Sequence, residues 1–264
     1  MRSVILLIGV LVALATLGPL IAPHDPAAIN LPNRLSPPGP AWLLGTDALG
    51  RDTLSRLLHG ARWSLGLAFV ISLMGAVIGT AVGLVAALGG QTVDWAVMRV
   101  TDAFLAFPEL IAAVVIAGIL GGGVNSLIFA LGVTSWMRYA RVARGVGLSL
   151  KSRGYVVQAR LAGMSPLAIA RWHYLPSLLP SLIVVWTGMF ARAILGISAL
   201  GFLGFGVQPP MAEWGTMLLD ARIHMRANPL QMIWPGLAVV TCVLAINLAG
   251  DVLRDAFAKT DTAP

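Results

Sequence analysis

The run from Trp63 to Val93 contains no charged side chain and is too long to be hidden inside a small soluble domain. A helix of this length could cross a membrane, because helices rise about 1.5 Å per residue and a hydrocarbon core about 30 Å thick needs roughly 20 apolar residues. Of the 264 residues, 58% are hydrophobic and 11% are charged. Soluble domains carry roughly a quarter charged residues, so a soluble fold could not bury this much apolar surface. We therefore expect a polytopic membrane protein.

Six apolar stretches have the length of membrane spans, at about 3–22, 63–88, 97–120, 124–146, 176–200 and 231–253. They predict an all-α protein with six transmembrane helices in one transmembrane domain over residues 1–264. The first stretch has a second interpretation as a secretory signal peptide, because Ala13-Leu14-Ala15 is similar to a small-residue cleavage site. A single positive charge before it and the further spans after it favour a membrane span.

Three glycines lie on one face of the second stretch. Gly75, Gly79 and Gly83 recur every four residues, with Ala87 next in the series. Small residues at this spacing let another helix approach closely, which matters in a membrane because van der Waals packing replaces the hydrophobic driving force. The pattern predicts a helix-packing face and carries no chemistry.

Positive charges gather after the fourth stretch. The segment from Arg138 to Arg171 has no acidic residue and contains Arg138, Arg141, Arg144, Lys151, Arg153, Arg160 and Arg171. Excess Arg and Lys mark cytoplasmic loops, so we expect this loop and both termini in the cytoplasm, with 24–62 and 201–228 outside. The net charge of +7 has the same explanation. Because basic and aromatic residues do not alternate as in single-stranded nucleic-acid sites, no nucleic-acid partner is expected.

The polar loop at 153–175 has strong local signals. Gly154–Leu161 can form a short helix, and Gly163 suits the left-handed position just past a helix end. Ser165 suits the N-cap and Pro166 the first position of a second short helix, which Arg171-Trp172 would end. Pro176 would then restart a helix that enters the bilayer. These signals predict a rigid knob between two spans; the alternative is an amphipathic helix lying on the lipid surface.

Four stretches carry a family resemblance. They are Leu44–Asp52 (LGTDALGRD) with 54–57 and 60–62, the 153–175 loop with Ala159, Gly163 and Leu175-Pro176, residues 202–210 (FLGFGVQPP) with Glu213-Trp214-Gly215, and the positions Asn247-Leu248, Gly250-Asp251 and Leu253-Arg254-Asp255. Together they resemble the inner-membrane permease of dipeptide, oligopeptide and nickel ABC importers over nearly all residues after about Asp25. One departure is Val157, which stands where the family's EAA signature begins with Glu, so that position has no charge here.

The resemblance implies a type I importer permease of the MetI-like fold, in a bacterial cytoplasmic (inner) membrane. Its implied partners are a second homologous permease, two ATP-binding subunits, a periplasmic or lipid-anchored solute-binding protein and membrane lipid. The 153–175 loop would be the cytoplasmic coupling helix that docks into an ATPase subunit. The residues implied in this docking are Ala159, Arg160, Gly163, Met164, Ser165, Pro166, Leu167, Ile169, Arg171, Leu175 and Pro176.

If ATP powers the protein, the ATP must be hydrolysed by a separate subunit. A phosphate-binding P-loop needs Lys after Gly, whereas Lys151 follows Leu150 and Lys259 follows Ala258. We therefore expect no cofactor and no enzymatic activity on this chain. Gly163-Met164-Ser165 could suggest a membrane serine protease, but a helix cap explains Ser165 better. The competing function is a secondary transporter or channel that needs no ATPase.

No metal site is expected, because His24, His59, His173 and His224 lack metal-site spacing. The cargo stays open between dipeptides, oligopeptides, nickel and metal chelates. Residues 212–215 and 229–236 are somewhat closer to nickel-type members. The segment after Leu200 predicts a short interfacial helix beneath a docked binding protein, built from Glu213, Trp214, Met217, Leu218, Asp220, Arg222, Ile223 and Arg226.

Ionisable residues at membrane depth raise a functional question, because they are costly there. Arg192 lies inside the fifth stretch and is hypothesised to face the translocation path and attract a substrate carboxylate. The alternative is an ion pair with Asp102 or Glu109 of the third stretch. Asp102 could also pair with Arg99 on its own helix. Asn247 is a further path candidate, with an interhelical hydrogen bond as the alternative.

Overall fold

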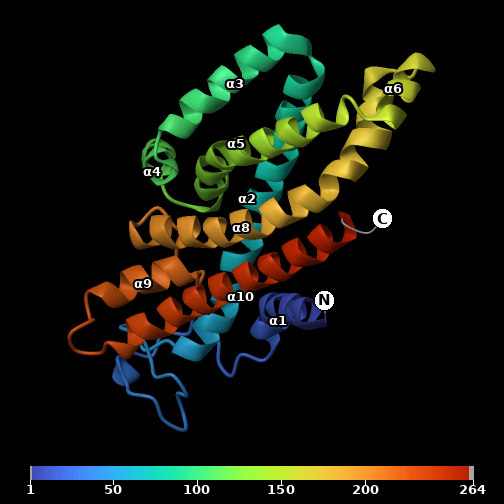
Figure 1. Cartoon of the computed structure of the whole chain (residues 1–264). Helices are drawn as coiled ribbons and strands as arrows, with labels where there is room; N and C mark the ends of the chain where they lie inside the picture. Colours follow the sequence, from blue (N-terminus) through green and yellow to red (C-terminus); the bar gives the residue numbers. More distant parts are fainter. Residues whose placement is uncertain (1, 262–264) are drawn as a thin grey trace.

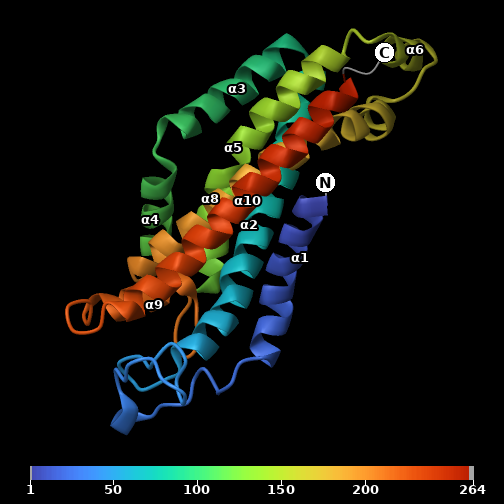
Figure 2. The same ribbon diagram turned by 60° about the horizontal axis from the view of Figure 1, so that its bottom comes forward.

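The computed structural model describes residues 2–261, and the described chain is built of helices. Long helices pack along an elongated molecule, with α6 at one end and α9 at the other (Figures 1 and 2). We call these the α6 end and the α9 end. The α-helices are α1 (Arg2–Leu17), α2 (Thr53–Leu88), α3 (Gly90–Ala106), α4 (Glu109–Leu120), α5 (Val124–Leu150), α6 (Gly154–Leu161), α7 (Pro166–Ile169), α8 (Leu175–Phe202), α9 (Trp214–Arg222) and α10 (Leu230–Asp261). The shorter turns are η1 (Gly18–Leu20), η2 (Leu31–Asn33) and η3 (Ala170–Tyr174).

Three helical segments of the described chain are long and apolar enough to cross a membrane. They are Thr53–Leu88, Pro166–Phe202 and Leu230–Phe257, and a fourth span results if α3 and α4 together make one. Helix α1 is apolar but shorter, and Leu11, Leu14 and Ala15 on it pack against the main core. Helix α5 is 27 residues long and carries Arg138, Arg141 and Arg144 in its second half.

The sequence predicted one continuous span for the third apolar stretch, but the structure shows two helices there. Helix α3 ends at Ala106, α4 begins at Glu109, and the two axes differ by 84°. The break lies at Pro108, whose ring removes a backbone donor and pushes the preceding residue out of the helical region. Phe107 accordingly has φ −86° and ψ 136°, which is extended backbone.

The predicted glycine face packs α2 against α5. A Cβ atom on Gly75 would collide with the side chain of Ser135, one on Gly79 with the Trp136 carbonyl, and one on Gly83 with the Ala140 carbonyl. The two backbones therefore lie closer than any residue with a side chain would allow. This confirms the glycine series as a packing signal.

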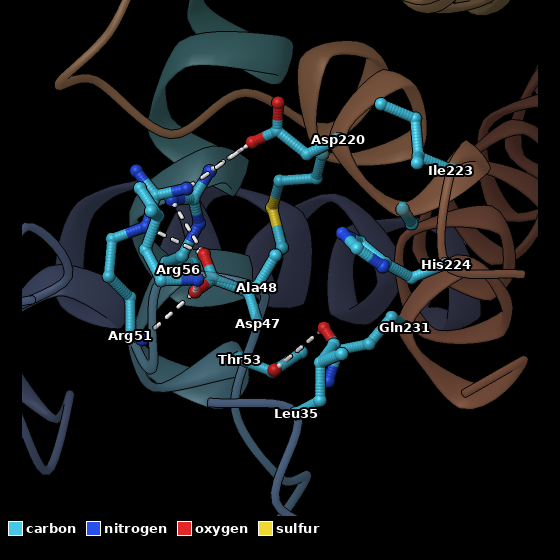
Figure 3. Close-up of a pocket in the computed structure, with 13 residues that line it drawn as sticks. Leu35, Asp47, Ala48, Arg51, Thr53, Arg56, Asp220, Ile223, His224 and Gln231 are labelled. Carbon is cyan, nitrogen blue, oxygen red and sulfur yellow. Dashed lines mark hydrogen bonds and ion pairs between the residues drawn. The ribbon is translucent and has the colours of Figure 1, made fainter. Parts of the chain in front are cut away.

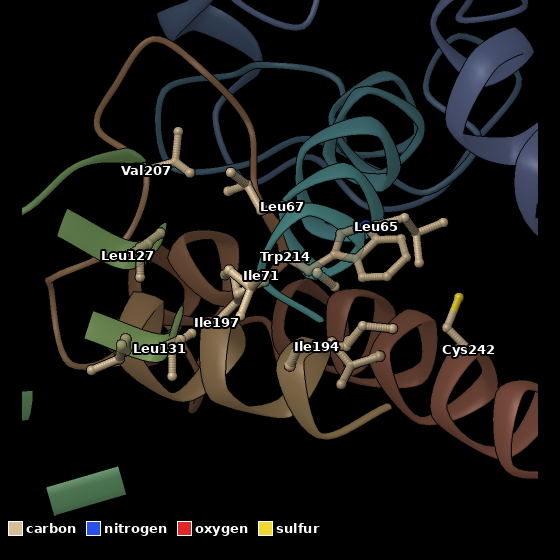
Figure 4. Packing of buried hydrophobic residues seen from close by; sticks show 14 of the residues in the cluster. Leu65, Leu67, Ile71, Leu127, Leu131, Ile194, Ile197, Val207, Trp214 and Cys242 are labelled. Carbon is tan, nitrogen blue, oxygen red and sulfur yellow. The ribbon is translucent and has the colours of Figure 1, made fainter. Parts of the chain in front are cut away.

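The main core joins α2, α5, α8 and α10 near the α9 end. Ile71, Leu127, Ile194, Ile197 and Trp214 are each less than 2% exposed and interdigitate there (Figure 4). Helix α9 is held to this core by Trp214, whose indole N–H donates to the Leu57 carbonyl of α2 at 3.1 Å. The core fixes α8, which also carries Arg192.

Candidate functional site

The loop between α5 and α8 folds as its local signals predicted. Helix α6 spans Gly154–Leu161, and Gly163 adopts φ +79°, where a glycine avoids the steric cost of a Cβ atom. The Ser165 hydroxyl accepts a hydrogen bond from the Ala168 backbone N–H at 3.2 Å, and Pro166 is the first residue of α7. The loop is therefore a helix, a glycine turn and a second capped helix.

The exit from this loop differs from our expectation. Residues Ala170–Tyr174 form a π-helical turn that runs directly into α8, so Pro176 does not restart a helix after a gap. The π-helical turn lies directly before Pro176, where the missing N–H of proline interrupts the regular α-helical hydrogen-bond pattern. The loop is thus joined to α8 by continuous helical backbone.

A second core holds the inner face of the loop rigidly. Val156, Ile169 and Tyr174 are at most 3% exposed and pack in one cluster with Tyr139 of α5 and Leu178 of α8. Leu84 of α2 and Ala143 of α5 belong to the same cluster. The loop therefore cannot shift without moving α5 and α8.

The outer face of the loop is apolar and exposed. Leu161 is 83% exposed, Leu167 79% and Trp172 64%. The Arg171 guanidinium stacks on the Trp172 ring at 5.4 Å from its centroid. Of the predicted docking residues, Ala159 and Ile169 are buried and Met164 is half-buried, whereas Arg160, Gly163, Ser165, Pro166, Leu167, Arg171, Leu175 and Pro176 are exposed. We call Leu161, Leu167 and Trp172 the apolar tip.

Arg192 and Glu109 line one cavity. It has a volume of about 460 Å³ and is formed by α2, α4, α5 and α8. The predicted ion pair between them is not formed, since among the side chains described, those of residues 6–257, neither has an oppositely charged partner within 4.0 Å.

Asp102 pairs with a different helix from the one predicted. Its carboxylate accepts from the Arg141 guanidinium of α5 at 2.6 Å, and Arg99 instead lies over the Trp95 ring at 5.6 Å. Asp94 likewise accepts from Arg144 Nη2 at 2.6 Å. These two pairs fasten α3 to α5. Asp102 lines a neighbouring cavity of about 750 Å³ with Arg138 and Arg141.

Asn247 is not brought to these cavities. It lies exposed on α10, and its side chain makes no hydrogen bond with the described residues. The interhelical hydrogen bond predicted for it is therefore not formed within the described chain. Of the four path candidates, the structure brings Arg192 and Glu109 to one cavity and Asp102 to the next.

The sequence did not predict that charged residues would form a cluster at the α9 end. Arg51 and Arg56 are 8% and 3% exposed, and both contact Asp47 and Asp220 (Figure 3). Asp47 lies 2.6 Å from Arg51 and 3.1 Å from Arg56, and Asp220 lies 3.3 Å and 3.2 Å from the same side chains. The cluster borders a cavity of about 210 Å³ and joins the segment before α2 to α9. Its two aspartates lie 173 residues apart in the chain (220 − 47) and nothing in the local pattern pairs them.

A family model and several relatives match this chain. The model described as "binding-protein-dependent transport system inner membrane component" matches residues 75–260. The chain belongs to this family. Members are inner-membrane components of transport systems, so this chain is a membrane translocation component and is not itself catalytic.

Two relatives show how much of the chain this family covers. The nickel transport system permease protein NikC of Escherichia coli (strain K12) is 41% identical over 254 residues, which cover 96% of this chain and 92% of NikC. The di/tripeptide transport system permease protein DppC of Pseudomonas aeruginosa (strain UCBPP-PA14) is 42% identical over 248 residues, which cover 92% of this chain and 82% of DppC. Both confirm the family that the sequence motifs indicated.

A solved structure shares the fold. A chain of the MetNI methionine ABC transporter, in an inward-facing conformation, has a TM-score of 0.62 and 24% identity and covers 76% of this chain and 95% of its own length. At this identity the likeness shows the fold alone. The family member described here is thus an all-helical, MetI-like permease.

Proposed function

We propose that this permease is one subunit of an ATP-driven importer that takes up small peptides or nickel and metal chelates. The relatives named NikC and DppC support this range of cargo. With a second, homologous permease the chain would form the translocation path, and a periplasmic or lipid-anchored solute-binding protein would deliver the cargo. The observation that carries the proposal is the rigid loop at 153–175 with its apolar tip.

The loop has the properties of a docking lever. Its inner face is packed against α2, α5 and α8, while Leu161 and Leu167 extend outward with no cover from the described chain. Exposed apolar patches bordered by charge are typical of protein–protein contacts. An ATPase subunit that grips the apolar tip would therefore move the loop as a solid body.

Helix α8 would pass this movement to the cavity. It runs without a break from Leu175, beside the loop, to Phe202 and carries Arg192 between them. At about 1.5 Å per residue, Arg192 lies roughly 25 Å along the helix from Leu175, so a movement of the loop would be carried over that length. The Arg192 cavity would then open to one side or the other as the two permeases rock against each other.

In our proposal six spans cross the membrane. Helices α1, α2, the bent pair α3–α4, α5, α8 and α10 would be these spans, with the arginine-rich loop and both termini in the cytoplasm. Helix α10 begins at the α9 end and runs toward the α6 end, which fits a cytoplasmic C-terminus (Figure 2). Helix α9 would then lie outside, beneath the binding protein, and exposed apolar side chains on α1 and α4 would face lipid or the second permease.

ATP hydrolysis would take place on two separate subunits, and this chain would hold no cofactor. The competing function is a transporter or channel that works without an ATPase. Reconstituting the chain with the second permease, the ATPases and the binding protein of its system distinguishes the two. We expect cargo uptake into vesicles only with ATP and all subunits; uptake by the chain alone would contradict the proposal.

A further inference from the structure

We propose that the Glu109–Arg192 cavity binds a zwitterion, with the ammonium group against Glu109 and the carboxylate against Arg192. A short peptide with free termini has this pair of charges. The inference rests on the proposed function and narrows its cargo at this site.

The two charged groups are the polar groups of the cavity that remain free. Ser72 donates its hydroxyl to the Phe69 carbonyl at 3.0 Å, and Ser135 donates to the Gly132 carbonyl at 3.0 Å. The rest of the described lining is apolar, formed by Ile71, Leu110, Leu131, Met189, Ala193, Leu195, Gly196 and Ala199. A ligand would therefore be oriented by one negative group on α4 and one positive group on α8.

Other charged clusters in the described chain are internally matched. Asp94 and Asp102 pair with arginines of α5, and the cluster at the α9 end matches two arginines with two aspartates. Glu109 and Arg192 instead lie in one cavity without closing on each other. Unmatched charges at membrane depth are costly. A ligand that carries both charges would satisfy both groups at once.

A neighbouring cavity also holds charged side chains, but there the acid is already paired, since Asp102 accepts from Arg141 at 2.6 Å. Arg138 follows Ser135 by one helical turn on α5 and lines that second cavity with Asp102 and Arg141. Arg138 has no oppositely charged partner within 4.0 Å among the described side chains. A free pair of opposite charges is therefore found in the Glu109–Arg192 cavity and not in this neighbouring one.

The cavity has the size and chemistry of a small-molecule site. Ligand pockets are commonly about 300–1,000 Å³, and this one measures about 460 Å³. In the described part of the chain, no group of three or more His, Cys, Asp or Glu side chains could hold a metal ion. The cavity therefore favours a charged organic group over a bare metal cation.

A thiol reporter tests the cavity without relying on delivery by a binding protein. Leu195→Cys places a cysteine in the lining, in a Cys242→Ser background that removes the chain's own thiol. The assembled complex without nucleotide is alkylated with N-ethylmaleimide in the presence of the dipeptide Ala-Ala, its N-acetyl form or its C-terminal amide. A competitor at about ten times its Kd should slow alkylation by roughly tenfold.

We expect Ala-Ala to protect the reporter more strongly than either blocked form. Arg192→Gln and Glu109→Gln should each abolish this protection, whereas Arg192→Lys should retain part of it and the exposed control Arg62→Gln should retain it fully. Equal protection by all three peptides, protection by the acetylated anion or the amide alone, or no protection would overturn the inference. ATP-driven uptake by the unsubstituted complex is measured in parallel, and its absence would instead contradict the proposed function.

Discussion

The hydroxyl of Ser64 on α2 donates a hydrogen bond at 3.0 Å to the carboxylate of Glu213, which precedes α9. Glu213 is fully buried and also accepts from the backbone N–H groups of Gly215 at 2.8 Å and Thr216 at 3.0 Å. One acidic side chain thereby caps α9 and ties it to α2. Glycines at 201 and 215 make room for it, since a Cβ atom on Gly201 would lie 2.7 Å from its Oε2.

Replacing Glu213 should loosen the α9 end. In Glu213→Gln one carboxylate oxygen becomes an amide N–H₂ that faces a backbone donor, and a buried donor left without an acceptor costs about 1–3 kcal/mol. We expect the free energy of unfolding in detergent to fall by this amount. Glu213→Ala should cost at least as much, and wild-type stability of either variant would contradict the capping role.

The pH dependence of stability should change in the same variant. Burial raises the pKa of Glu213 above its ordinary value of 4.5, against the opposing effect of its hydrogen bonds. An acid whose pKa is raised by folding binds more protons in the folded state, so its contribution to stability decreases as the pH rises from 4.5 toward the folded pKa. Glutamine does not titrate.

The stability deficit of Glu213→Gln should therefore narrow as the pH increases. Unfolding curves of both proteins measured across this range give the difference directly. A deficit that widens with pH would show that the three hydrogen bonds outweigh burial and lower the pKa of Glu213 instead.

Packing of α2 on α5 should be sensitive to a single methyl group. Gly79→Ala places a Cβ atom against the Trp136 carbonyl, and overpacking of this kind costs about 1–3 kcal/mol. Gly66 on the same helix has open space around it, so Gly66→Ala is the matched control. We expect only the first variant to lower the melting temperature; equal behaviour of the two would contradict the close approach of the helices.

The charged cluster at the α9 end should depend on the charge of Asp47. Asp47→Asn keeps an oxygen for the backbone N–H groups of Leu49 and Arg51 but removes both ion pairs with Arg51 and Arg56. Leaving two buried arginines with a single exposed partner should cost about 3–5 kcal/mol in unfolding free energy. The exposed Asp25→Asn serves as control and should be neutral. A neutral Asp47→Asn would contradict a structural role for the cluster.

Local signals predicted the loop at 153–175 well. Ser165 and Gly163 define a cap and a turn through their own backbone chemistry, so the bounds of α6 and the start of α7 could be read from residues a few positions apart. The third stretch was instead expected as one span, and the 84° angle between α3 and α4 at Pro108 was not predicted.

Contacts between distant residues could not be predicted. Helix α2 begins ten residues before the apolar stretch does (63 − 53), and in this first part Arg56 is buried because it is paired with Asp47 and Asp220. The predicted partner of Asp102 was also wrong. Arg99 is near Asp102 in the chain, whereas Arg141 on α5 is near it in space. The spacing of residues along the sequence does not show which helices pack against each other.

The lever proposed for the 153–175 loop is tested most directly by site-specific crosslinking in the assembled importer. Leu167→Cys in the Cys242→Ser background places one reactive thiol at the apolar tip, and Ile223→Cys, 80% exposed beyond α9, places one at the opposite end. We predict that the thiol at 167 links to the ATPase subunit and that the thiol at 223 links to the solute-binding protein. A link from 223 to the ATPase, with none from 167, would contradict the lever and invert the topology.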